Sequence, residues 1–173
     1  MALDRDALKT VMLAATEMQT IGAVALLSLG TAVAAYIVAN TDLTFKWVAT
    51  NTAPPFDTEN VTATGKILTC TILLTPSLST IQGGGLVFMA TQMVAGIRLG
   101  TFNITQGGWA TGPELLSDCP DFSLSIEMTD SRDNAYEQLA TKIVDQLKDY
   151  QPGTPIAGTH GSYAGATTEC VIS

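Results

Sequence analysis

Residues 19–41 carry no charged side chain, and this run limits the folds open to the chain more than any other feature. Most of its residues are apolar or small, and no proline occurs between residues 2 and 40. An α-helix rises about 1.5 Å per residue, so about 20 residues span roughly 30 Å, the thickness of the hydrocarbon layer of a bilayer. We therefore predict one long hydrophobic helix over residues 1–40, acting as an assembly or membrane element.

A seven-residue repeat indicates how such a helix would pack. Apolar residues or glycine fill two of the seven positions, as they do in the seam of a coiled coil. The apolar half of the segment would satisfy any such pattern, so the signal comes from residues 4–20, whose charged and polar side chains avoid both positions. The predicted assembly seam comprises Leu8, Val11, Ala15, Met18, Gly22, Ala25, Leu29, Ala32 and Tyr36.

Three surroundings would cover this helix: the core of its own domain, other protein subunits, or lipid. The helix would be about 50 Å long or more, and a domain of this size has little room to enclose it, which favours subunits or lipid. Over residues 14–40 a lone Glu17 precedes an apolar run that leads into a β-rich domain. This arrangement resembles the layout of type IV pilins, although the prepilin cleavage signature with its adjacent phenylalanine is absent.

The overall composition also indicates a surface that is meant to be covered. Only 14% of the 173 residues are charged, against roughly a quarter in an average soluble domain. The net charge is -8, and no window gathers enough Lys or Arg to neutralise a run of phosphates, so we predict no nucleic-acid partner. The chain contains 25 threonines, a residue that packs well on exposed β-sheet.

Alternation of apolar and polar residues predicts strands in the rest of the chain. We expect strands over residues 43–50, 66–75 and 121–128, with a loop at residues 51–60 that contains Pro54 and Pro55. The inward face of the second strand would consist of Leu68, Cys70, Ile72 and Leu74.

An amphipathic helix is predicted over residues 132–150, with capping side chains just before it and Pro152-Gly153 after it. The predicted fold class is therefore α+β. It combines the long hydrophobic N-terminal helix with a mainly antiparallel β domain over residues 41–153 that includes the one amphipathic C-terminal helix. A Gly-rich arm with a possible last strand follows over residues 154–173.

Two segments admit two interpretations each. Residues 86–99 match both a helical stripe and a strand alternation, so periodicity does not decide between them. The last strand, at residues 167–172, would either close the sheet of its own chain or pair with the sheet edge of a neighbouring subunit.

No motif in the sequence predicts catalysis, a cofactor or a metal. His160 is the only histidine and lies in a Gly-rich segment, which is a poor rigid platform for acid–base chemistry. Asp118 and Asp121 flank Cys119-Pro120 and would suit a hard cation, but a solvated acidic turn explains them better. The three cysteines have no CxxC spacing, and we expect them to be buried thiols rather than one disulfide and a free thiol.

These observations predict a non-catalytic structural subunit. It would assemble with copies of itself into a virion or an extracellular filament through its N-terminal helix. The first alternative is a single-span membrane protein with an extracytoplasmic β-rich domain, whose helix contacts membrane lipid. The second is a soluble ligand-binding or enzymatic domain with a deeply buried helix.

Overall fold

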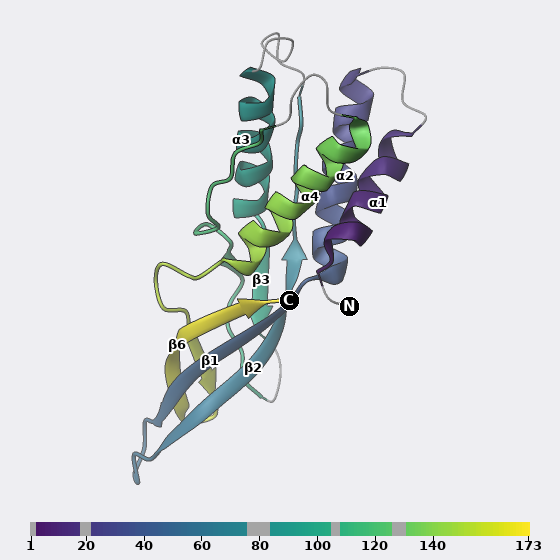
Figure 1. The fold of residues 1–173 in the computed structure, drawn as a ribbon. Helices are drawn as coiled ribbons and strands as arrows, with labels where there is room; N and C mark the ends of the chain where they lie inside the picture. Colours follow the sequence, from purple (N-terminus) through teal and green to yellow (C-terminus); the bar gives the residue numbers. More distant parts are fainter. Residues whose placement is uncertain (1–2, 18–21, 76–83, 105–107, 126–130) are drawn as a thin grey trace.

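A computed structural model describes residues 3–17, 22–75, 84–104, 108–125 and 131–173. The described part of the chain is elongated, with helices at one end and a curled antiparallel sheet at the other (Figure 1). The predicted α+β class, with its hydrophobic N-terminal helix and amphipathic C-terminal helix, is confirmed. In chain order the elements are α1 (Arg5–Thr16), α2 (Gly22–Asn40), β1 (Asp42–Asn51), β2 (Thr58–Thr69), α3 (Gly84–Arg98), β3 (Thr101–Ile104), β4 (Glu114–Leu115), α4 (Arg132–Lys148), β5 (Ala157–His160) and β6 (Tyr163–Ile172).

The N-terminal forty residues form two antiparallel helices instead of one. The Tyr36 hydroxyl, near the end of α2, donates a 2.9 Å hydrogen bond to the carbonyl oxygen of Asp4 and accepts one of 3.1 Å from the Asp4 amide. In a single continuous helix these two residues would lie roughly 48 Å apart. The hydrophobic helix is thus confirmed over Gly22–Asn40, whereas the continuous helix over residues 1–40 is wrong.

The Tyr36 hydroxyl gives a test of this helical hairpin. We expect Tyr36→Phe to lower the free energy of unfolding by about 1–2 kcal/mol, because the change removes two hydrogen bonds at a side chain that is only 7% exposed. Urea denaturation measures the change. The control is Thr10→Ala, which removes an exposed bond within α1 and should change stability by less than about 0.5 kcal/mol. Equal effects of the two substitutions would contradict the hairpin.

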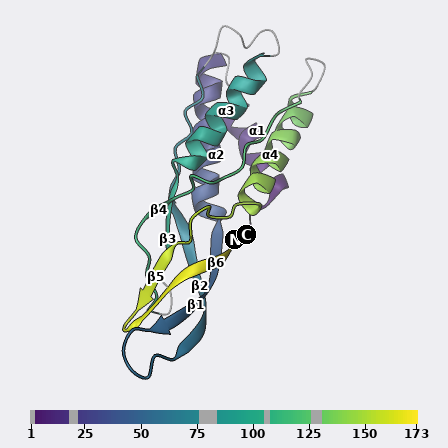
Figure 2. The same cartoon turned by 90° about the vertical axis from the view of Figure 1, so that its left-hand side faces the viewer.

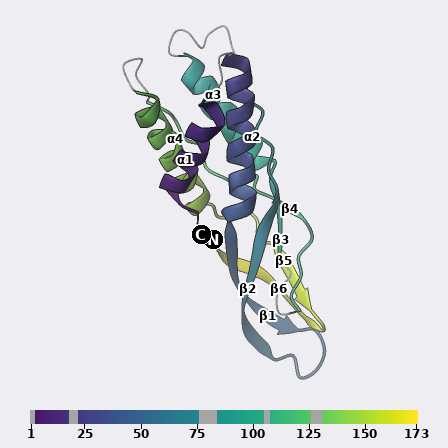
Figure 3. The same cartoon turned by 90° about the vertical axis from the view of Figure 1, so that its right-hand side faces the viewer.

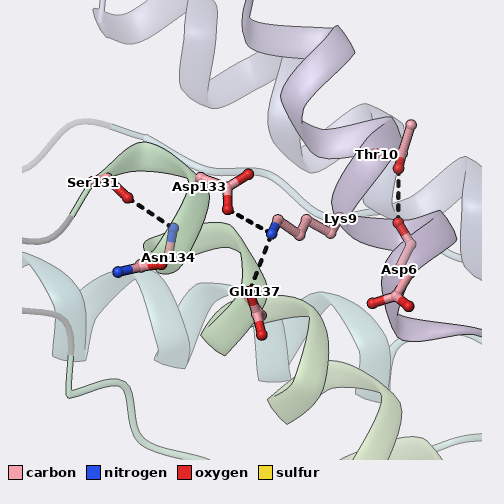
Figure 4. A network of polar contacts seen from close by, with 7 residues as sticks. All are labelled: Asp6, Lys9, Thr10, Ser131, Asp133, Asn134 and Glu137. Carbon is pink, nitrogen blue, oxygen red and sulfur yellow. Dashed lines mark hydrogen bonds and ion pairs between the residues drawn. The ribbon is translucent and has the colours of Figure 1, made fainter.

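Helix α4 packs against α1, and ion pairs join the two helices at their surface (Figure 4). The ammonium of Lys9 lies 2.7 Å from a carboxylate oxygen of Asp133 and 3.1 Å from one of Glu137. These hydrogen bonds raise the pKa of Lys9 above its ordinary value. The predicted start of α4 is confirmed, since the hydroxyl of Ser131 accepts a bond from the Asn134 amide and caps the helix.

The six strands form one antiparallel sheet in the order β4-β3-β2-β1-β6-β5, and the sheet curls until its two ends meet (Figure 2). Ala110, which follows β3, exchanges two backbone hydrogen bonds of 3.2 and 3.3 Å with Thr159 of β5. The adjacent Thr111 amide bonds to the carbonyl of Ile104 in β3. The segment at residues 110–111 therefore bridges β3 and β5 and covers part of the sheet edges.

The inward face of the curled sheet holds an aromatic core. Phe45 of β1 stacks on Phe102 of β3 with ring centroids 5.5 Å apart, and Tyr150 contacts Phe102 edge-on. Trp47 meets Trp109 edge-to-face at 5.3 Å. The alternation that predicted the strand over residues 43–50 places Leu43, Phe45, Trp47 and Ala49 on this buried face, so that strand is confirmed.

The strand predicted over residues 66–75 begins earlier, at Thr58, and ends earlier, at Thr69, so the predicted loop is shorter than residues 51–60. An irregularity between Ile67 and Thr69 changes the pairing with β3, so Ile67 is buried and Leu68 points outward, contrary to the predicted inward face. The following residues leave the sheet and pass between α2 and α3. Buried and exposed side chains still alternate in this segment, because Ile72 and Leu74 are buried against the two helices.

The structure also shows which interpretation is right for the two segments that the sequence left undecided. Residues 86–99 are mainly helical, as α3, and the last strand closes the sheet of its own chain as β6, paired with β1 and β5. At residues 121–125 the predicted strand is wrong, since these residues form none, and residues 126–128 lie outside the described residues. The sequence did not predict strands β3 and β5, because each has only four residues, too few to show a clear alternation.

Candidate assembly surface

One face of α2 is apolar and exposed. The helix buries the side that contacts α1 and residues 72–74, while its opposite side carries Val24, which is 43% exposed, and Leu27, which is 52% exposed. Thr31, Ala35 and Ala39 continue this exposed side toward the end of the helix. None of the residues 22–40 is charged. We call this side, defined by Val24, Leu27, Thr31, Ala35 and Ala39, the α2 face.

A groove runs along the C-terminal half of α2, between this helix and the chain segment that follows β2. Thr31, Ala35 and Ala39 of the α2 face form part of its wall. Its volume is about 460 Å³. The described residues that line it carry no charge, and Leu73, at its rim, is 63% exposed. The lining consists of Thr31, Ala34, Ala35, Val38, Ala39, Cys70, Thr71, Ile72 and Leu73. We call it the α2 groove, and Figure 3 shows α2 on the side of the molecule that faces the viewer.

Two glycines hold the segment at residues 71–72 close to the helices and so shape the groove. An added Cβ at Gly96 of α3 would lie 2.6 Å from the carbonyl oxygen of Thr71 and 2.9 Å from the Cα of Ile72. On the other side, a Cβ at Gly30 of α2 would overlap the carbonyl oxygen of Ile72. The backbone therefore sits directly against both helices, and only small side chains line the groove on the α2 side.

The predicted assembly seam does not coincide with the α2 face. The antiparallel arrangement of α1 and α2 places its members on different sides of two helices, so no single stripe runs from residue 8 to residue 36. Leu8, Leu29 and Tyr36 are buried inside the chain, Gly22 is exposed, and Met18 lies outside the described residues. The remaining members are partly buried: Val11, Ala15, Ala25 and Ala32. The seam therefore does not offer a continuous surface to another subunit.

The residues weighed for acid–base or metal chemistry have structural partners. His160 packs edge-on against Trp109, with ring centroids 5.4 Å apart. The Asp118 carboxylate accepts a 2.9 Å bond from the Gly153 amide, and Asp121 forms an ion pair of 3.1 Å with Arg98. In the part of the chain that the structure describes, no three His, Cys, Asp or Glu residues are grouped to hold a metal.

The three cysteines are free thiols, two of them fully buried. Burial raises the pKa of Cys119 and Cys170 to about 12 and that of Cys70 to about 11. At neutral pH they are therefore protonated and poor nucleophiles. Cys70 differs from the other two because it lines the α2 groove.

No family model, no curated protein and no solved structure matches this chain. By length and composition α2 is able to cross a membrane, with a mean hydropathy of 2.0 and a third of its span buried against the rest of the chain. The helix does not stand apart from the domain, however. It contacts α1, whose Lys9 is paired with two carboxylates of α4.

Proposed function

We propose that this chain is a non-catalytic structural subunit that assembles with copies of itself through the α2 face and the α2 groove, in a virion or an extracellular filament. The observation that carries the proposal is the exposed, charge-free side of α2, where Val24 and Leu27 leave about half of their surface in water. An apolar surface without charges is a candidate for binding protein or membrane.

The packing around α2 favours protein over lipid as the partner. Inserting α2 into a bilayer in this conformation would carry α1 and α4 with it, and therefore the charges of Lys9, Asp133 and Glu137. Charged side chains in the hydrocarbon layer cost several kcal/mol each. The small residues along the α2 face, by contrast, allow another helix or loop to approach closely.

Light scattering in detergent-free buffer tests the proposal. We expect the purified chain to have a mass several times that of one 18.1 kDa subunit, and Leu27→Asp to shift it toward the monomer, because the substitution places a charge in the middle of the covered surface. Leu99→Asp is the matched control, since Leu99 is 69% exposed but lies at the end of α3, outside the α2 face.

Leu27→Asp, Leu99→Asp and the addition of detergent distinguish self-assembly from the single-span alternative. A wild-type chain that remains an 18.1 kDa monomer at all concentrations without detergent would contradict self-assembly. A chain that precipitates without detergent and disperses as monomers in micelles would support the single-span alternative, which the length and hydropathy of α2 favour. Equal effects of Leu27→Asp and Leu99→Asp would show that the α2 face is not the contact surface.

A further inference from the structure

The turn between β1 and β2 lies at the end of the molecule opposite the helices (Figure 1). Phe56 is 61% exposed, and the neighbouring Pro54 and Pro55 are exposed as well. The backbone of Phe56 has φ = 57°, in the left-handed region that residues other than glycine rarely adopt. Such a conformation costs about 1–2 kcal/mol. We call Pro54, Pro55 and Phe56 the tip knob.

Hydrogen bonds hold the base of the tip knob in place. The Asp57 carboxylate accepts a 2.7 Å bond from the hydroxyl of Tyr163 and a 3.1 Å bond from the side-chain amide of Asn51. These bonds lower the pKa of Asp57, so the carboxylate stays ionised and tied to its own chain at neutral pH. Thr52 adds two bonds of 2.8 Å to the carbonyl of Ser162 in the neighbouring turn. The loop is therefore bonded on both sides.

This arrangement exposes the apolar ring of Phe56 and keeps its backbone strained. Within the described structure the ring gains little from burial, although covering a phenylalanine side chain is worth about 1.5–3 kcal/mol. Strained residues that their surroundings hold in place occur mostly at sites of function. The tip knob thus has the features of a docking element whose partner lies outside its own chain.

The α2 groove of the same chain is out of reach of the tip knob. Strand β1 runs from the end of α2 to the turn over ten residues, which corresponds to roughly 30 Å. The strand is paired on both sides, with β2 and with β6, so it does not bend back toward the helices. Any contact between the tip knob and an α2 groove must therefore join two chains.

We propose that the tip knob of one copy of this chain inserts into the α2 groove of a second copy. This inference rests on the proposed function and names the contact within it. Both surfaces lack charge: the three knob residues have none, and neither do the described residues that line the groove. A cavity of about 150 Å³ is enough to hold benzene, so a groove of about 460 Å³ has room for the Phe56 ring and an adjacent proline.

The positions of the two surfaces determine the type of assembly. The β1–β2 turn, which carries the tip knob, lies at the end of the sheet, whereas α2 lies in the helical half (Figures 1 and 3). Residues of α2 form one wall of the α2 groove. A contact between two different surfaces is heterologous, and every subunit that has joined still offers one free knob or one free groove. Unless two copies make both contacts reciprocally, such a contact produces a filament, or a ring if the rotation closes.

A disulfide test uses the native cysteine of the groove. Ala53 is exposed, and its carbonyl accepts a 2.9 Å bond from the Phe56 amide, so Ala53→Cys places a thiol beside the knob and keeps the Phe56 ring. In this variant, oxidation with copper phenanthroline should join the new thiol to Cys70 of the next subunit, because Cys70 lines the α2 groove. Since burial raises the pKa of Cys70 to about 11, the reaction is run at pH 9. We expect a non-reducing gel to show a ladder of dimers, trimers and higher species, which the double variant Ala53→Cys, Cys70→Ser loses. Leu99→Cys is the matched control and should give no ladder that depends on Cys70.

Each other outcome overturns the inference. Dimers that persist without Cys70 would show that two tips pair with each other. No cross-linking in a chain that light scattering shows to be assembled would exclude the knob–groove contact and leave the proposed function standing. If light scattering shows the wild-type chain to be a monomer, both the knob–groove contact and the proposed self-assembly are wrong. As a second readout, Phe56→Gly should reduce the assembled mass while the chain stays folded, because glycine adopts the positive φ without strain.

Discussion

Replacing Gly96 by alanine should lower the free energy of unfolding by about 2 kcal/mol, although alanine is the better helix former by about 1 kcal/mol. The reason is the packing of α3 against the segment that follows β2. A Cβ at Gly96 would lie 2.6 Å from the Thr71 carbonyl oxygen and 2.9 Å from the Cα of Ile72, and both atoms belong to the backbone. Because backbone atoms do not rotate away, either α3 or this segment must shift.

Gly22→Ala is the matched control for this effect. Gly22 is also a helical glycine, at the start of α2, but an added Cβ would meet no heavy atom within 4 Å. Helix propensity then acts alone, and we expect the variant to be as stable as the wild type or up to about 1 kcal/mol more stable. Urea denaturation of both variants measures the difference. If Gly96→Ala also stabilises the chain, residues 71–72 do not pack directly on α3.

The same pair of substitutions bears on the assembly surface. The segment at residues 70–73 forms one wall of the α2 groove, and Gly96 packs against it from the side of α3. A shift of this segment in Gly96→Ala would therefore change the shape of the groove. At temperatures where Gly96→Ala is still folded, we therefore expect it to weaken assembly as well, whereas Gly22→Ala should not. A loss of stability without any change in assembled mass would place the contact between subunits elsewhere.

The sequence predicted the elements whose signals are local. Helix α4 has a 3.6-residue apolar stripe, the capping Ser131 and a terminating Pro152-Gly153, and β1 alternates regularly over its whole length. The N-terminal segment lacked such signals, because a charge-free run satisfies one long helix as well as two shorter ones. The Asp4 cap and the buried Leu8, Met12 and Thr16, spaced four residues apart, would have indicated a separate first helix.

Residues 86–99 and the α2 groove required tertiary information. Helix α3 matched two periodicities because apolar residues occupy both patterns, and the backbone contact at Gly96 is visible only after folding. The groove combines residues 31–39 with residues 70–73, which no local pattern connects. The tip loop was predicted from Pro54 and Pro55. The positive φ of Phe56 was not, because it occurs in a loop that Asp57 and Thr52 tie to Tyr163 and Ser162, over a hundred residues away.

Raising the pH from 9 to 10 should remove roughly 3 kcal/mol from the free energy of unfolding, a large fraction of the stability of a typical domain. In the folded chain burial raises the pKa of Cys119 and Cys170 to about 12 and that of Cys70 to about 11, while an unfolded thiol has a pKa of about 9. Below pH 9 both states keep these protons and stability is unaffected. From pH 9 the unfolded state ionises first, so each thiol costs about 1 kcal/mol between pH 9 and 10, and the slope approaches about 1.4 kcal/mol per pH unit above that.

Urea denaturation at half-unit steps from pH 7 to 10.5, with a reducing agent present, measures this slope. Cys170→Ala should be less stable at pH 7, because it leaves a small cavity. Its slope between pH 9 and 10 should fall by about a third, since one of three titrating thiols is gone. Burial also raises the pKa of Tyr150, so this comparison stays below pH 10, the ordinary pKa of tyrosine. The ion pair of Lys9 does not interfere, because its raised pKa keeps that contribution intact up to about pH 10.5. An unchanged slope in Cys170→Ala would mean that this thiol is not buried in the folded chain, and that β6 does not pack its inward face as described.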